Sequence, residues 1–387
     1  MQIYLDYSAT TPPRPEVMAT LYDNLTHQWG NPSSLHSWGQ RAAMVLETAR
    51  MQVANLINAS TPESIIFTSG GTEANNLALM GVARQYQEPQ HLIISAVEHS
   101  AVAEPARLLE QLGWQVTRLP VNLTGRVNPL DLQAAWQPNT ALVSVIYGQS
   151  EVGTIQMIAE LAQITHRLGG LFHTDAVQVA GRLPINVQRL GVDLLSLSSH
   201  KIYGFQGAGA LYLKPGVTLS PLFAGGGQEG KLRSGTQAVP AIKGFGVAAQ
   251  LALEEMAQET PRLISLRDRL FGLLANFPYL VPTGDRLYRL PHHVSFCLKN
   301  LNSKITGKTL VRQLNLAGIA ISAGSACHSG TLSPSPILLA MGYSANQALS
   351  GIRLTLGKDT TEADIDWTAM VLKQIIQRLL SEELVTT

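Results

Sequence analysis

The feature that most constrains the fold is a series of short apolar runs between residues 64 and 213. The runs are Ser64–Thr68, His91–Ala96, Ala141–Tyr147, Leu171–Thr174, Asp193–Ser198 and Gly209–Leu213. Several are apolar almost without alternation, which is typical of strands buried on both faces of a mostly parallel sheet. Helical patterns lie between them, over Thr72–Tyr86, Ser100–Gln111 and Ile155–Leu168. This rhythm predicts an α/β domain.

The rest of the chain has a different character. A length of 387 residues exceeds the usual size of a single core, so a second, smaller domain is expected. A helical pattern follows Thr236 and extends to about Ala257. Beyond it, helical patterns mix with a strand, which predicts an α+β domain: Pro261–Ala275, Glu362–Ser381 and His293–Leu298. We assign residues 15–257 to the large domain, and residues 1–14 and 258–387 to the small one.

Composition excludes several classes of protein. The net charge of +1 and the absence of like-charge blocks give no reason to expect nucleic-acid binding. The chain contains no run of 18 uncharged apolar residues, so no membrane span is expected. Its first residues lack the pattern of a signal peptide. The two cysteines, Cys297 and Cys327, form no disulfide framework and no zinc-binding spacing, so we expect a reducing cytoplasmic setting and no metal site.

Polar clusters follow five of the apolar runs. They are Ser69–Thr72, Glu98-His99, Gln149–Glu151, Asp175–Gln178 and Ser198–Lys201. In α/β sheets, ligands gather at the carboxyl ends of the strands. The sequence therefore predicts one composite site at that edge of the large sheet.

Each cluster has both a functional and a structural interpretation. The loop around Gly71 and Thr72 leads into a helix, whose N-terminus suits a phosphate, although a helix cap accounts for it equally well. Asp175 ends a buried strand, where a pyridinium nitrogen could be its partner, or it could cap a turn. Lys201 is a candidate for a Schiff base because desolvation would lower its pKa, although most lysines are surface charges.

The two cysteines differ in their surroundings. Cys327 lies in a segment rich in Gly, Ser and Pro, where a reactive thiol is expected to be accessible. Cys297 belongs to the alternating run His293–Leu298 and is interpreted as a structural residue.

Together these clusters resemble the NifS/IscS-type cysteine desulfurases of the class V aminotransferase family. The resemblance covers nearly the whole chain, in order and at the family's spacing. Beyond the clusters already described, it includes Tyr4–Thr11, Asn31–His36, Gly225–Glu229, Arg233–Thr236, the Cys327 segment and Gly351–Leu354. It implies a fold-type I architecture with a large, mostly parallel seven-stranded sheet domain and a smaller domain that carries the cysteine loop.

The resemblance also implies the chemistry. Pyridoxal 5'-phosphate (PLP) is the implied cofactor and L-cysteine the substrate, which is converted to L-alanine with a persulfide on Cys327. Lys201 would bind the cofactor as a Schiff base, and His99 would stack on its ring. The residues implied to bind the cofactor are Gly71, Thr72, Ser150, Asp175, Gln178, Ser198, His200, Lys201 and Thr236. Arg353 and Asn31 are implied to bind the substrate.

The implied assembly is a homodimer, in which Thr236 contacts the cofactor phosphate of the second subunit. The implied partner is a sulfur acceptor such as an iron–sulfur scaffold. Two residues keep structural alternatives: His99 as a satisfied structural histidine, and Arg353 as the partner of a core carboxylate.

One position departs from the family pattern. The family usually has Asn-Asn-Glu where this chain has Gln149-Ser150-Glu151, and the serine has a shorter reach and no amide. This departure is the only support for one alternative, a weakly active PLP-binding scaffold. Other PLP activities on the same fold also stay open: a selenocysteine lyase, a cystine C–S lyase or an aminotransferase. The sequence does not identify the sulfur acceptor.

Overall fold

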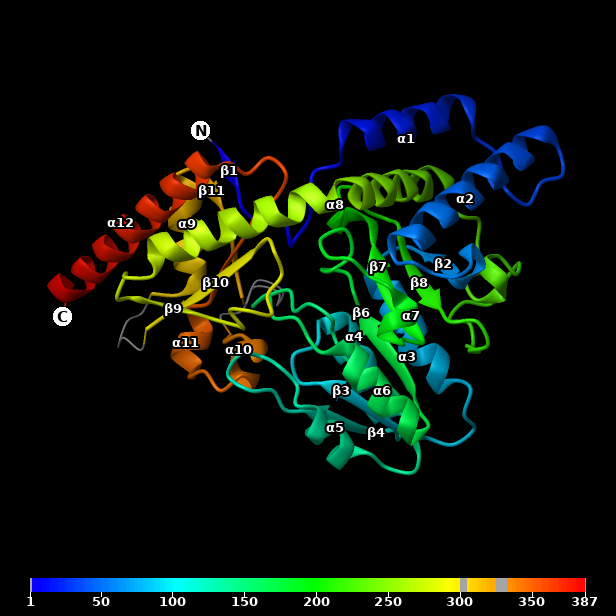
Figure 1. Cartoon of the computed structure of the whole chain (residues 1–387), viewed down its shortest axis with the longest axis horizontal. Helices are drawn as coiled ribbons and strands as arrows, with labels where there is room; N and C mark the ends of the chain where they lie inside the picture. Colours follow the sequence, from blue (N-terminus) through cyan, green and yellow to red (C-terminus); the bar gives the residue numbers. More distant parts are fainter. Residues whose placement is uncertain (1, 300–304, 325–332, 387) are drawn as a thin grey trace.

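The computed structural model describes residues 2–299, 305–324 and 333–386. Two groups of elements lie side by side in Figure 1, and one long helix, α8 (Val239–Leu274), runs along both. None of the helices in the described ranges is both long enough and apolar enough to cross a membrane.

The larger group is built on a seven-stranded sheet with the order β2-β8-β7-β6-β5-β3-β4. Only β8 runs antiparallel to its neighbours, so the predicted mostly parallel sheet is confirmed. The strands are β2 (Ile65–Thr68), β3 (His91–Ser95), β4 (Gln115–Leu119), β5 (Thr140–Ser144), β6 (Leu171–Asp175), β7 (Leu194–Ser198) and β8 (Gly209–Leu213).

Helices cover both faces of this sheet. Successive side chains of a strand point to opposite faces, so both faces present apolar side chains for the helices to bury. Leu195 and Leu197 of β7 belong to a core that includes side chains of α2, α6 and α8, whereas Leu194 joins a core with α3 and α4. The helices of this group, besides α8, are α1 (Pro15–His27), α2 (Ser37–Leu56), α3 (Gly71–Ala83), α4 (Ser100–Gln111), α5 (Pro129–Ala135), α6 (Ile158–Leu168) and α7 (Val187–Leu190). Three short 3-10 helices also belong to this group: η1 (Pro62–Ser64), η2 (Ser199–Lys201) and η3 (Glu229–Lys231).

The smaller group has its own sheet, with the order β12-β13-β10-β9 and antiparallel pairing throughout. These strands are β9 (Leu280–Pro282), β10 (His293–Leu298), β12 (Ser322–Ala323) and β13 (Ile352–Thr355). A further pair, β1 (Ile3–Tyr4) and β11 (Ile319–Ala320), is parallel and joins the N-terminus to this group. Its helices are α9 (Gly307–Leu316), α10 (Pro336–Ala340), α11 (Ala345–Leu349) and α12 (Glu362–Thr386).

Helix α8 corrects one sequence prediction. We expected one helix to end near Ala257 and another to begin at Pro261, but the structure has a single helix across both positions. Met256 packs in the core of the large sheet and Leu263 in that of the small sheet, so burial on both sides outweighs the helix-breaking tendency of Pro261. The predicted division into two domains remains a prediction, and α8 would cross its boundary.

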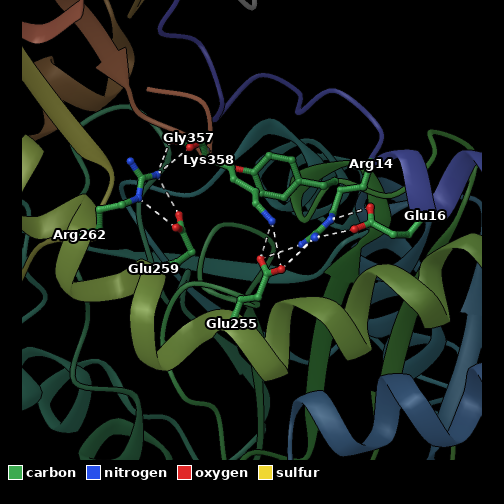
Figure 2. Close-up of polar contacts among 8 residues, drawn as sticks. Arg14, Glu16, Glu255, Glu259, Arg262, Gly357 and Lys358 are labelled. Atoms are coloured by element: carbon green, nitrogen blue, oxygen red, sulfur yellow. Dashed lines mark hydrogen bonds and ion pairs between the residues drawn. The ribbon is translucent and has the colours of Figure 1, made fainter. Parts of the chain in front are cut away.

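Polar contacts also fix α8 where the two groups meet (Figure 2). Glu255 accepts hydrogen bonds from both terminal nitrogens of Arg14, each at 2.8 Å, and from Lys358 Nζ. Two turns later, Arg262 donates to Glu259 and to the carbonyl oxygens of Gly357 and Lys358. The N-terminal segment, α8 and the loop after β13 therefore meet at one junction.

Candidate active site

A cavity of about 440 Å³ lies at the carboxyl ends of the large sheet's strands. Segments that follow β2, β3, β5, β6 and β7 contribute to its wall, as expected from the five polar clusters. The small sheet and the N-terminal segment close its other side. The lining residues are Asp6, Ser8, Ala9, Gly71, Thr72, Asn75, His99, Ala101, Ile146, Ser150, Glu151, Asp175, Val177, Gln178, Ser198, His200, Lys201, Ser322, Ala323, Gly324 and Arg353.

Lys201 lies at the end of η2, directly after β7. Its amine donates hydrogen bonds to the carbonyl oxygens of Ser8 at 2.7 Å and Ala9 at 2.6 Å. Burial lowers the pKa of Lys201 to about 8, and the nearby cations Arg353 and Arg182 act in the same direction. Part of the population therefore carries a neutral amine near neutral pH, which is the form that attacks a carbonyl.

Asp175 is the last residue of β6 and is only 5% exposed. Its Oδ2 accepts a hydrogen bond from Asn75 Nδ2 at 2.7 Å, and its Oδ1 accepts one from the backbone N–H of Val177. The second contact is the turn cap considered in the sequence analysis, so both interpretations of Asp175 apply. Asn75 itself was missed as a site residue, because only the fold brings the first turns of α3 beside the end of β6.

Another part of the cavity wall is suited to an anion. Helix α3 begins at Gly71, and its N-terminus carries free N–H groups and a positive dipole end. A Cβ at Gly71 would lie 2.8 Å from Val177 Cγ2, so glycine permits the close packing here. Thr72, Ser198 and His200 line the same cavity and can donate hydrogen bonds to an anion.

His99 has a structural and a potential catalytic role at once. It caps α4, since its Nδ1 accepts the N–H of Ala101 at 3.1 Å, and it also lines the cavity. Burial lowers its pKa, which favours the neutral imidazole. His200 is neutral for the same reason, because burial lowers its pKa to about 4.

Two buried carboxyl groups beside the site were quoted in the sequence analysis without a role. Burial raises the pKa of Glu98 to about 8 and that of Glu151 to about 7. Each has one buried carboxyl oxygen without a hydrogen-bond partner among the described residues. The feature of the sequence that could have indicated a role for them is their position next to His99 and Ser150.

Arg353 extends from β13 into the cavity, where its two terminal nitrogens are already engaged. One donates to Asp6 Oδ1 at 2.7 Å and the other to the backbone oxygen of Ser150 at 3.1 Å. Ser150 thus holds Arg353 through its main chain. A carboxylate partner was the structural alternative for Arg353, and that partner is Asp6.

Two predicted residues of the described part of the chain are not brought into this cavity, and a third cannot be placed. Asn31 and Thr236 are exposed and do not line it, and Cys327 lies outside the described residues. Ala323 and Gly324, which precede the Cys327 segment, do line it. Cys297 is fully buried in β10, where burial raises its pKa to about 12, so it is unsuited to act as a thiolate.

The residues present fit PLP. Gln178 Oε1 and Asn75 Oδ1 are buried without partners in the described parts of the chain, so the cavity wall has unused acceptors. A carboxylate on one side, an anion cradle on another and a lysine of lowered pKa match the ring nitrogen, phosphate and aldehyde of this cofactor.

Comparisons with known proteins agree with a PLP-binding site. Residues 3–367 match the family model described as aminotransferase class-V. The cysteine desulfurase IscS of Dictyoglomus turgidum is 44% identical over 98% of this chain and 95% of the relative. The cysteine desulfurase IscS 1 of Archaeoglobus fulgidus is 40% identical over 98% of both chains.

Solved structures are similar to this chain as well. A NifS-like protein has a TM-score of 0.90 and 33% identity, over 98% of this chain and all of that one. SspA in complex with cysteine has a TM-score of 0.79 and 32% identity, over 92% of this chain and 99% of that one. The chain belongs to the class-V aminotransferase family. Its members of the cysteine desulfurase type are PLP-dependent, and the predicted fold-type I architecture is confirmed.

Proposed function

We propose that the chain is a PLP-dependent cysteine desulfurase that converts L-cysteine to L-alanine and carries the sulfur as a persulfide on Cys327. The observation that carries this proposal is the single cavity that joins Lys201, Asp175 and Arg353. The desulfurase names of relatives 40–44% identical over nearly the whole chain support it. A structural relative is also described in complex with cysteine.

The described residues divide the cofactor between them. Asp175, fixed by Asn75, would face the ring nitrogen, and Gln178 would hydrogen-bond the ring oxygen. Gly71, Thr72, Ser198 and His200 would hold the phosphate at the N-terminus of α3. When bound, PLP supplies a ring that withdraws electrons and stabilises negative charge on the Cα of an amino acid.

The remaining side chains handle the substrate and its protons. Arg353 binds the α-carboxylate, for which a guanidinium fork is well suited. Lys201 would hold the cofactor through its amine, and the same amine would be the base that moves the proton at Cα. His99, kept neutral by burial, lines the cavity, where it would pack on the ring and take or give a proton.

Sulfur transfer is assigned to Cys327. Its thiolate attacks the sulfur of the substrate, the Cβ–S bond breaks, and an S–S bond forms on the enzyme. The two sulfur atoms are oxidised together while the substrate carbon is reduced and takes up a proton, which leaves L-alanine. Cys297, the other cysteine of the chain, is excluded from this step by its burial in β10.

The proposed assembly is a homodimer, supported by a broad apolar surface on α1, α2 and the segment between them. Eight large apolar side chains on this surface are between 46% and 92% exposed: Met18, Tyr22, Leu25, Trp29, Leu35, Trp38, Met44 and Met51. Such a surface is typical of a protein–protein interface. Asn31 and Thr236, exposed in one chain, are proposed to act in the partner's cavity.

The proposed biological role is the supply of sulfur in the cytoplasm to an acceptor protein such as an iron–sulfur scaffold. The IscS names of the relatives support this role.

The proposal is tested with two cysteine variants of the PLP-loaded protein and an excess of L-cysteine. Cys327→Ser should abolish alanine formation and keep the visible absorbance of the cofactor, whereas Cys297→Ser should retain turnover. Normal turnover by Cys327→Ser would exclude Cys327 as the nucleophile. Pyruvate and ammonia in place of alanine would identify a C–S lyase.

A further inference from the structure

The proposed carboxylate-binding residue, Arg353, is already paired with a carboxylate of its own chain. Arg353 and Asp6 form an ion pair at 2.7 Å, and their side chains are only 13% and 20% exposed. Both side chains line the 440 Å³ cavity. The pair therefore lies in the wall where the α-carboxylate of an amino acid would have to bind.

Hydrogen bonds already occupy one N–H group on each terminal nitrogen of Arg353. One terminal nitrogen is occupied by Asp6 and the other by the backbone oxygen of Ser150. Its Nε is buried and has no partner among the described residues. A substrate carboxylate bound through the remaining N–H groups would share one guanidinium with the Asp6 carboxylate.

Of the two acceptors, the Asp6 carboxylate is the one that can move. The Ser150 oxygen belongs to the main chain and also accepts a hydrogen bond from His293 Nε2 at 3.1 Å. Within the described parts of the chain, Arg353 is the only hydrogen-bond partner of the Asp6 carboxylate.

The backbone around Asp6 is held independently of its side chain. Its carbonyl oxygen accepts hydrogen bonds from Tyr4 Oη and from the N–H groups of Ala9 and Thr10. The carboxylate can therefore leave Arg353 without unfolding the segment.

Charge makes an exchange more favourable than a shared site. Two carboxylates at one guanidinium repel each other, and the repulsion is strong in a partly buried cavity where water screens charges poorly. We propose that Asp6 occupies the carboxylate-binding position of Arg353 in the free enzyme and is replaced there by the α-carboxylate of the incoming amino acid. This inference rests on the proposed function, which assigns Arg353 to the substrate.

The exchange has a consequence for specificity. Every ligand that uses Arg353 must first displace Asp6, so part of its binding free energy is spent on the exchange. Asp6 thus acts as a positioning residue that keeps Arg353 neutralised and aimed into the cavity. The same segment also contacts the amine of Lys201 through the backbone oxygens of Ser8 and Ala9, so the exchange takes place next to the cofactor lysine.

The test is an equilibrium titration of the PLP-loaded protein with L-alanine, followed by the visible absorbance of the cofactor. Asp6→Asn and Asp6→Ala should each bind L-alanine about tenfold more tightly than the wild-type protein, because the competing charge is gone. The KM for L-cysteine should fall by a similar factor while kcat changes little. L-alaninamide, which lacks the carboxylate, should bind the wild-type protein and the variants alike.

Tyr4→Phe is the matched control. It removes the hydroxyl that donates to the backbone oxygens of Asp6 and Thr10 but leaves the carboxylate in place, so it should not tighten L-alanine binding. Unchanged or weaker binding by both Asp6 variants would overturn the inference, as would equal tightening by Tyr4→Phe. A wild-type protein that binds L-cysteine without releasing alanine would contradict the proposed function alone, since the titration would still decide the role of Asp6.

Discussion

The Glu98→Gln variant should be less stable than the wild-type protein at pH 5 and more stable than it at pH 8. Glu98 is 6% exposed, and its Oε1 accepts hydrogen bonds from Ser95 Oγ and from the N–H of Ile146. Its Oε2 is buried without a partner in the described ranges. Burial, reinforced by the charge of Asp175, raises the pKa of Glu98 from 4.5 to about 8.

The sign of the pH effect follows from this raised pKa. Below about pH 4.5 Glu98 is protonated in both the folded and the unfolded state, so its ionisation does not change the free energy of unfolding. As pH rises towards 8, only the unfolded state releases its proton, so the free energy of unfolding falls. Each pH unit contributes about 1.4 kcal/mol, and the full interval amounts to a loss of up to about 5 kcal/mol at pH 8.

Glutamine is neutral at every pH and can accept the same two hydrogen bonds. Its amide nitrogen would take the place of Oε2 without a partner, which costs about 1 kcal/mol. We therefore expect Glu98→Gln to be slightly less stable than the wild-type protein at pH 5 and more stable by about 2–4 kcal/mol at pH 8.

The assay is thermal unfolding of both proteins at pH 5 and pH 8 with saturating PLP. Ser95→Ala is the matched control, because it removes one donor to Glu98 and keeps the titrating carboxyl group, so its stability should fall with pH as the wild-type stability does. A difference between wild type and Glu98→Gln that is the same at both pH values would refute the reasoning.

Two further predictions concern the cofactor lysine and the junction at α8. Lys201→Ala should lose the visible absorbance of covalently held PLP, and a retained band after dialysis would mean that another lysine binds the cofactor. Glu255→Gln should destabilise the protein by about 1 kcal/mol at pH 7, a value reduced for solvent screening because the pair is partly exposed. The hydrogen bonds from Arg14 are the main cause that lowers the pKa of Glu255 to about 2, so this stability is present above pH 4.5 and is lost as pH falls towards 2. Urea unfolding at pH 7 and pH 3 measures the change, and a larger loss at pH 3 would contradict it.

The large sheet was predictable because its strands are buried on both faces and so consist of nearly continuous apolar residues. Strand β4 shows where this signal fails: four of its five residues, Gln115–Arg118, are exposed or only partly buried at the edge of the sheet. The two-residue strands β11 and β12 carry no periodicity at all. Helix α8 was divided at Pro261 because local propensity cannot anticipate packing against two separate cores.

The site was predictable where its residues follow strands. Lys201, Asp175 and His99 each come within three residues of the end of an apolar run, and the parallel sheet brings the ends of those runs together. Asp6 and Asn75 were missed because each gains its meaning from a partner far away in the sequence, Arg353 and Asp175 respectively. The assignments of Asn31, Thr236 and Cys327 remain predictions.

The central claim is that sulfur leaves cysteine and arrives on Cys327. Its most direct test mixes the PLP-loaded protein with one equivalent of L-cysteine, quantifies alanine, and locates the added sulfur atom by mass spectrometry of the peptides. We expect one alanine for each persulfide, with the extra sulfur on the peptide that contains Cys327. Alanine without a persulfide on that peptide, or sulfur found on Cys297, would contradict it.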